Sequence, residues 1–126
     1  PETRFDAVML DAPCSATGTI RRHPDLPHRF DPGGLAALSD LQGRLLDWAW
    51  AWLAPGGTLV FATCSALRAE GEDRIAAFRG AEETLPAPVE GDFATPEGDL
   101  RTLPCDWSDI GGLDGFFAAR LVKPAT

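Results

Sequence analysis

The chain has 126 residues, of which 44% are hydrophobic, a size and composition that predict one small globular domain with a modest core. Its formal net charge of −8 by itself speaks against a nucleic-acid partner. No run approaches the roughly 20 apolar residues that a membrane span needs, and no charged-then-apolar leader precedes a cleavage site, so we expect a soluble chain.

The acidic residues are unevenly distributed along the chain. Residues 66–114 contain twelve acidic residues and four arginines, an excess of eight that equals the net charge of the whole chain. Residues 1–30 are neutral overall and carry basic clusters at Arg21-Arg22-His23 and His28-Arg29. This distribution allows a local basic patch on an otherwise acidic protein.

The three cysteines, Cys14, Cys64 and Cys105, are widely spaced and include no C-x-x-C pair. An odd number at this spacing argues against a disulfide framework, and a structural zinc site would need about four close ligands. We therefore expect no metal and a reducing, cytoplasmic environment. Because the chain begins at Pro1 and a strand follows almost at once, we also expect it to be a piece of a longer protein.

The first predicted element is a strand over residues 5–10, an apolar run with the length of a buried strand. It stops at Asp11-Ala12-Pro13-Cys14, because Pro13 cannot donate a ladder hydrogen bond. A carboxylate and a thiol thus follow the carboxyl end of a strand, which is where open α/β sheets bind their ligands.

A long loop and a helix are expected next. Residues 15–34 are rich in glycine and proline, and loops of this length in a compact domain are usually functional or disordered. Residues 35–53 predict an amphipathic helix, because apolar residues recur at three- and four-residue steps. Asp31-Pro32 and the capping box Ser39-x-x-Gln42 compete as its start, and Pro55-Gly56-Gly57 is expected to end it.

The tryptophans of this helix, Trp48, Trp50 and Trp52, invite an interpretation as base-stacking residues. Residues spaced two apart on a helix cannot share one face, so a common stacking surface is not expected. We predict that Trp48 and Trp52 pack against the core and that Trp50 is half exposed.

The rest of the chain predicts a second strand, a second helix and a final strand pair. The second strand shows little alternation, as a strand buried on both faces should, and Cys64-Ser65 follows it directly. Residues 80–99 carry little signal, and part of this segment is expected to be loosely ordered. The predicted elements are a strand over 58–63, a helix near 70–78 with Ile75 and Phe78 facing inward, and antiparallel strands over 100–103 and 116–122.

The order of the elements predicts an α/β fold. A strand–helix–strand unit with a helix of this length implies a right-handed crossover and two parallel neighbouring strands. Cys14 and Cys64, fifty residues apart in sequence, should then emerge side by side at one edge of the sheet, within several ångströms of each other.

Two thiols and a carboxylate at one crevice favour nucleophilic catalysis, because a thiolate is a strong nucleophile once its pKa is lowered. Free cysteines are also among the most buried residues of protein cores, which is the structural alternative. The matched strand ends, one of them preceded by Asp-x-Pro, favour a catalytic pair at Cys14 and Cys64. Cys105 has no such context and is interpreted as structural or incidental.

Five segments then carry a resemblance to a known family: DAPCSATGTIRRHPD at 11–25, LQ at 41–42, PGG at 55–57, ATCS at 62–65 and DGFFAAR at 114–120. They resemble the RNA cytosine-5 methyltransferases, and most closely the bacterial Sun-type family that modifies 16S ribosomal RNA. The combination of D-A-P-C-S with T-C-S is specific. The resemblance implies a Rossmann-like fold that uses S-adenosylmethionine, of which this chain is similar to the C-terminal half, from the fourth strand to the last.

The resemblance also implies roles for individual residues. Cys64 corresponds to the nucleophile that adds to carbon 6 of cytosine, and Cys14 to the cysteine that helps to release the product. Asp11 is expected to contact the N3/N4 edge of the base and to border the cofactor.

The resemblance further implies contacts to the RNA. Pro13 lies in the motif beside the substrate, and Arg21, Arg22 and His23 are expected to grip phosphates around a flipped-out cytosine. Two arginines on a loop are equally compatible with an ordinary solvated surface. Departures from the family pattern at Pro27-His28-Arg29 and at residues 68–72 concern the choice of RNA substrate rather than the reaction class.

The glycine-rich strand–turn that would cradle the cofactor is missing from the sequence, as is the acidic residue after a second strand. We therefore expect the 126-residue chain to bind S-adenosylmethionine poorly and to be inactive alone.

Two other readings stay open. One is an amino-methyltransferase, which carries an aromatic residue where Cys14 stands and forms no covalent adduct. The other is a non-catalytic RNA-binding or assembly module. The truncated sheet of such a half-domain would expose an unpaired edge, which invites self-association.

Overall fold

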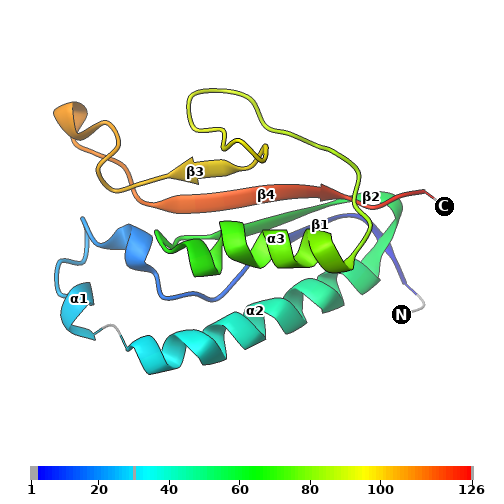
Figure 1. The fold of residues 1–126 in the computed structure, drawn as a ribbon, viewed down its shortest axis with the longest axis horizontal. Coiled ribbons are helices and arrows are strands. Elements are labelled where there is room, and N and C mark those ends of the chain that lie inside the picture. The colour runs from blue at the N-terminus through cyan, green and yellow to red at the C-terminus, as the bar shows by residue number, and fades with distance from the viewer. Residues whose placement is uncertain (1–2, 30, 126) are drawn as a thin grey trace.

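The computed structural model describes residues 3–29 and 31–125 and shows a mixed four-stranded sheet with helices packed on one face (Figure 1). The strand order is β1-β2-β4-β3, in which β1 and β2 are parallel and β4 is antiparallel to both its neighbours. The predicted α/β class, the parallel first pair and the closing antiparallel pair are therefore confirmed. The strands are β1 (Phe5–Asp11), β2 (Leu53–Thr63), β3 (Leu100–Thr102) and β4 (Phe116–Val122).

The crossover helix α2 (Pro32–Trp52) connects β1 to β2. Its N-cap is Asp31, whose side chain accepts a hydrogen bond from the N–H of Gly33 at 2.9 Å, with Pro32 in the first turn. The Asp31-Pro32 start is confirmed and the Ser39 start is wrong. The expected stop at Pro55-Gly56-Gly57 is also wrong, because the helix ends at Trp52 and these residues belong to β2. There Gly56 has a positive φ of 81° and donates to the carbonyl of Lys123, which extends the strand pairing past the irregular turn.

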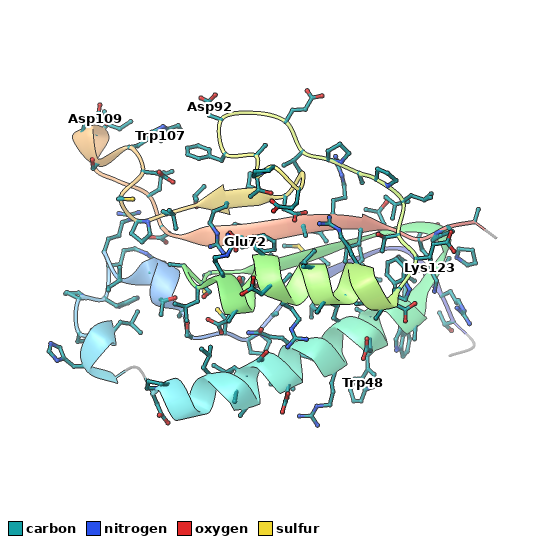
Figure 2. The ribbon with its side chains drawn as sticks, in the orientation of Figure 1. Trp48, Glu72, Asp92, Trp107, Asp109 and Lys123 are labelled. Atoms are coloured by element: carbon teal, nitrogen blue, oxygen red, sulfur yellow. The ribbon has the colours of Figure 1, made fainter. Side chains whose placement is uncertain are left out.

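The prediction for the tryptophans of α2 is wrong. Trp50 is only 7% exposed and packs edge-on against Phe78 at 5.2 Å between ring centroids, whereas Trp48 and Trp52 are 69% and 44% exposed. The buried side of the helix runs through Gln42, Leu46 and Trp50, which are spaced four residues apart, so Trp48 projects away from the sheet (Figure 2).

The first strand is also more exposed than expected. Phe5 is 46% and Met9 is 70% exposed, because β1 is the outer strand of this sheet and has a neighbour on one side only. The core lies instead around the central strands, where Phe61 of β2 and Phe117 of β4 are completely buried and pack edge-on.

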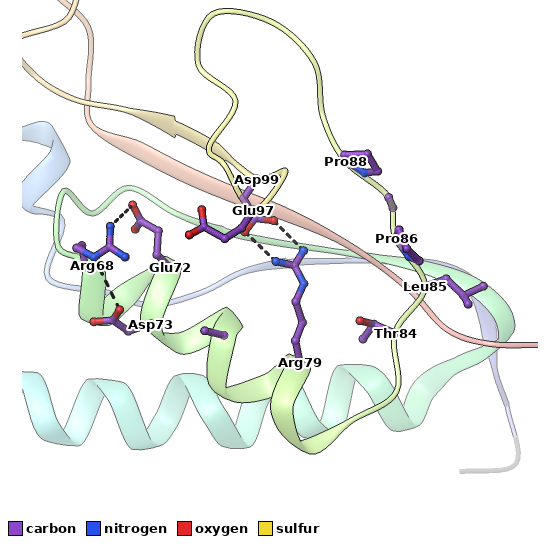
Figure 3. A pocket seen from close by; sticks show the side chains of 12 residues that line it. Arg68, Glu72, Asp73, Arg79, Thr84, Leu85, Pro86, Pro88, Glu97 and Asp99 are labelled. Atoms are coloured by element: carbon purple, nitrogen blue, oxygen red, sulfur yellow. Dashed lines mark hydrogen bonds and ion pairs between the residues drawn. The ribbon is translucent and has the colours of Figure 1, made fainter.

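The remaining elements follow the predicted order. The second helix, α3 (Glu72–Ala81), buries Ile75 and Phe78 as predicted. The long loop after β1 holds two short helices. The segment that follows α3 is attached to the strands by isolated bridges, and Asp99 at its end pairs with Arg79 of α3 (Figure 3). The short helices are η1 (Thr17–Thr19), α1 (Leu26–Arg29), η2 (Arg68–Glu70) and η3 (Ser108–Ile110).

Candidate active site

The two cysteines meet where the parallel strands end. Asp11 pairs with Ala62 in the register of β1 and β2, and the N–H of Ala12 extends the ladder to the carbonyl of Ala62 at 2.9 Å. The segments that follow β1 and β2 then leave the sheet at the same edge, and the Sγ atoms of Cys14 and Cys64 lie 3.5 Å apart. The predicted proximity is confirmed, because a right-handed crossover brings equivalent ends of two strands together.

Two glycines lock the loop that follows Cys14 against both neighbouring segments. Gly18 donates to the carbonyl of Cys64 at 2.9 Å, and Gly115, just before β4, donates to the carbonyl of Gly18 at 2.6 Å. A Cβ on Gly18 would lie 1.9 Å from the carbonyl oxygen of Gly115 and 2.7 Å from that of Cys64. The backbones approach so closely that only glycine fits at position 18.

A buried carboxylate that sequence reasoning missed lies behind the cysteine pair. Glu70 is 0% exposed and accepts hydrogen bonds from Ser15 and Ser65, the residues that directly follow the two cysteines. Gln42 of α2 donates to the same carboxylate and to the carbonyl of Pro13. The repeated Cys-Ser dipeptide, together with a glutamine on the apolar stripe of a helix, was the available signal.

The environment of Cys14 favours its neutral form. Burial raises the pKa of the Cys14 thiol to about 12, the N–H of Ala16 opposes this rise by donating to Sγ at 3.4 Å, and Cys64 and Glu70 add to the rise. Cys14 is therefore a protonated thiol near neutral pH. A protonated thiol donates a hydrogen bond, and the nearest sulfur to receive it is that of Cys64.

A second ionic cluster supports the loop that follows Cys64. Arg101 of β3 donates to the carbonyls of Ser65 and Leu67, pairs with Glu72 and lies over the ring of Phe117 at 5.2 Å. Burial alone would raise the pKa of Glu72, but hydrogen bonds from Arg101 and its own N–H, with the charges of Arg101 and Arg68, hold the pKa below its ordinary value. The Arg101 guanidinium thus connects the loop after Cys64 to β3 at the edge of the sheet.

The other predicted site residues lie around this pair. Asp11 and Pro13 are exposed at the end of β1, and His23 is exposed on the following loop. Arg21 and Arg22 are both exposed and both paired with Asp114, at 2.9 and 2.8 Å. Asp114 directly precedes Gly115, whose N–H donates to Gly18. These ion pairs and this hydrogen bond therefore join the loop that follows Cys14 to the segment before β4.

One cavity lies away from the cysteine pair. It measures about 440 Å³, lies between α3 and residues 84–88, and is not lined by any of the three cysteines. Its charged lining is largely paired within itself, with Arg79 on Asp99 and Arg68 near Glu72 (Figure 3). The cavity is therefore separate from the cysteine pair at the sheet edge.

The described residues do not fit S-adenosylmethionine as a cradle. Asp11 is exposed at the end of β1, but within residues 3–29 and 31–125 no strand is followed by a glycine-rich turn into a helix. In the same residues no group of three or more metal-ligating side chains is found, and no helix is long and apolar enough to span a membrane.

Solved structures share this fold and place it among the methyltransferases. The protein PH0851 is 36% identical and superimposes with a TM-score of 0.84 over 94% of this chain and 26% of its own. A methyltransferase homologue from Pyrococcus horikoshii is 28% identical, with a TM-score of 0.76 over 97% of this chain and 40% of its own. The expected methyltransferase fold is therefore confirmed.

The chain belongs to the family of the 16S rRNA methyltransferases RsmB/F, whose model matches residues 1–122. It is similar to ribosomal RNA small subunit methyltransferase B of Cronobacter sakazakii, at 43% identity over 97% of this chain. The protein of the same name from Xylella fastidiosa is 47% identical over 94% of this chain. The chain spans 27% of the length of each of these two relatives.

Proposed function

We propose that this chain is the C-terminal half of the catalytic domain of a longer RNA cytosine-5 methyltransferase that acts on 16S ribosomal RNA. The observation that carries the proposal is the pair of sulfurs 3.5 Å apart at the carboxyl ends of two parallel strands. The family and its rRNA-modifying relatives support the substrate class.

Cytosine chemistry explains the need for a nucleophile. Carbon 5 of cytosine is too electron-poor to attack a methyl sulfonium group unaided. Addition of the Cys64 thiolate to carbon 6 forms a carbon–sulfur bond and moves the electron pair of the C5–C6 bond toward carbon 5, which becomes enamine-like. Covalent catalysis thereby divides one difficult step into easier ones.

Release of the product requires the reverse of this addition. The proton on carbon 5 must leave, its electron pair must reform the C5–C6 bond, and the bond from carbon 6 to Cys64 must break. Cys14, a protonated thiol 3.5 Å from that sulfur, is suited to this step. Its proton passes to the departing Cys64 sulfur and the carbon 5 proton replaces it, so both thiols are restored.

The exposed residues around the pair are suited to hold the substrate. Asp11, exposed at the end of β1, reaches the N3/N4 edge of a flipped-out cytosine, and Pro13 lies beside it. Arg21, Arg22 and His23 contact RNA phosphates, which position the strand without reading its sequence. The ion pairs to Asp114 keep the arginines in place before RNA arrives.

The methyl donor is S-adenosylmethionine, which supplies an electrophilic methyl group and is held mainly by parts of the longer protein outside this chain. We expect the isolated 126-residue chain to be inactive for that reason. Methyl transfer by the isolated chain would refute this part of the proposal.

The test is trapping of the full-length parent on 5-fluorocytosine-substituted ribosomal RNA in the presence of the methyl donor. Fluorine at carbon 5 cannot leave as a cation, so elimination stalls and the adduct survives denaturation. We expect the complex with the wild type and with Cys14→Ala, and none with Cys64→Ala. Loss with Cys14→Ala instead would exchange the two roles, and no complex in any variant would favour the amino-methyltransferase or the non-catalytic module.

A further inference from the structure

Glu70 is an unusual residue to find completely buried. A buried charge is costly unless it is paired or fully hydrogen-bonded, and within the described part of the chain no ion pair involves Glu70. Its four hydrogen bonds come instead from donors: the Ser15 N–H, the Gln42 amide and two serine hydroxyls. These four donors at its two oxygens offset the cost of burying the carboxyl group.

The geometry of these bonds joins the two cysteine-bearing loops at one atom. Oε1 of Glu70 accepts from the Ser15 hydroxyl at 2.5 Å and from the Ser65 hydroxyl at 2.6 Å. Ser15 follows Cys14 and Ser65 follows Cys64, so one carboxylate oxygen is hydrogen-bonded to the residue after each cysteine.

The second oxygen of Glu70, Oε2, is connected to the residues on both sides of Cys14. Oε2 accepts from the N–H of Ser15 at 2.8 Å and from Nε2 of Gln42 at 3.1 Å. Gln42 also donates to the carbonyl of Pro13 at 2.9 Å, so the residues before and after Cys14 are both attached to this carboxylate.

We propose that Glu70 is a positioning residue that sets the separation of the Cys14 and Cys64 sulfurs and thereby the rate at which the RNA adduct is released. The inference rests on the proposed function for its kinetic part only. Glu70 touches neither sulfur in a hydrogen bond and acts through Ser15 and Ser65. Its negative charge also helps to keep Cys14 protonated, which is the form that returns a proton to the departing sulfur.

The experiment uses the full-length parent and three variants. Glu70→Ala removes both the hydrogen bonds and the charge. Glu70→Gln keeps the shape and an acceptor, and its amide can donate to a serine hydroxyl, so it removes the charge alone. The matched control is Asp99→Ala, which removes another buried carboxylate. Asp99 is 2% exposed, pairs with Arg79 and shares no partner with the cysteine loops.

The first measurement needs no RNA. Phenylarsine oxide condenses with two neighbouring thiols, forming two arsenic–sulfur bonds and releasing water, and mass spectrometry identifies the product by its bridged tryptic peptides 5–21 and 45–68. We expect Glu70→Ala to slow bridging about 100-fold, because a displacement of about 1 Å costs that much in rate. Asp99→Ala should stay within about twofold of the wild type, since distant sites act independently, and Glu70→Gln should restore most of the rate.

The second measurement follows formation and release of the adduct on unmodified RNA, together with the pH dependence of Cys14 alkylation. We expect slow release with Glu70→Ala, and alkylation at lower pH with Glu70→Gln, a shift that a purely structural role would not produce. The inference is overturned if Glu70→Ala bridges and releases at wild-type rates, or if Asp99→Ala shows the same losses. Absence of an adduct in the wild type would refute the proposed function, and the arsenical measurement would still decide the role of Glu70.

Discussion

Replacement of Gly18 by alanine tests whether the close backbone approach holds the cysteine pair. The new Cβ would lie 1.9 Å from the carbonyl oxygen of Gly115 and 2.7 Å from that of Cys64, and neither is the end of a flexible side chain. The backbone must therefore move by about 1 Å or more, at an overpacking cost of about 1–3 kcal/mol. Loss of the two hydrogen bonds at Gly18 adds about 1 kcal/mol each, for a total of about 3–5 kcal/mol.

Urea unfolding of the parent measures this loss of stability. Trapping on 5-fluorocytosine RNA reports the displacement of Cys64, whose backbone carbonyl meets the new Cβ, and we expect a trapping rate about 100-fold lower. The control is Gly80→Ala on α3, where a Cβ meets nothing within 4 Å. It should gain up to about 1 kcal/mol of helix stability and trap normally. The reasoning fails if Gly18→Ala unfolds at the wild-type midpoint and traps at the wild-type rate.

The other predictions concern charge, pH and the sheet edge. Because the pKa of Glu72 is lowered in the folded protein, its pairing with Arg101 stabilises the fold above about pH 4.5, and this stabilisation is lost as pH falls through the folded pKa. The urea midpoints of wild type and Glu72→Gln should therefore converge in acid. Because the pKa of Cys14 is raised from 9.0 to about 12, stability should fall as pH rises through that interval, and iodoacetamide should modify Cys14 slowly below it. Arg22→Ala should weaken RNA binding by the parent and reduce the slope of log affinity against log salt by about 0.9; an unchanged slope would remove Arg22 from the phosphate contacts. The isolated chain should self-associate through the open edge of β1, which sedimentation would detect, whereas a monomer at every concentration would contradict this expectation.

Several features of the fold followed from local rules. Asp31 and Pro32 start α2. The Asp31 side chain accepts a hydrogen bond from a free N–H of the first turn, and Pro32 has no N–H to leave unpaired. The crossover rule then placed Cys14 next to Cys64 across fifty residues, since equivalent ends of parallel strands meet. The final strand was predicted with its observed bounds, because Phe116–Val122 is apolar at every position except Arg120.

Other features depended on neighbours that a local pattern does not contain. The rotation of α2 about its axis depends on α3, because Phe78 of α3 packs edge-on against Trp50. Trp48 and Trp52 therefore lie on the exposed side of α2. The exposure of Met9 was decided by the place of β1 in the sheet, because an apolar run does not specify how many neighbours its strand has.

Two Cys-Ser dipeptides at the ends of two strands, with an aspartate before one of them, were enough to predict that two thiols meet at one edge of the sheet. The way in which the thiols are held depends on the folded chain, because Glu70 accepts hydrogen bonds from Ser15 and Ser65, which are fifty residues apart in sequence. Burial of Cys14 likewise depends on the packed loops and not on its neighbours in sequence, and it keeps that thiol protonated. Hydrogen bonds between distant residues and the removal of water exist only once the chain has folded, which is why no periodicity or motif predicted them.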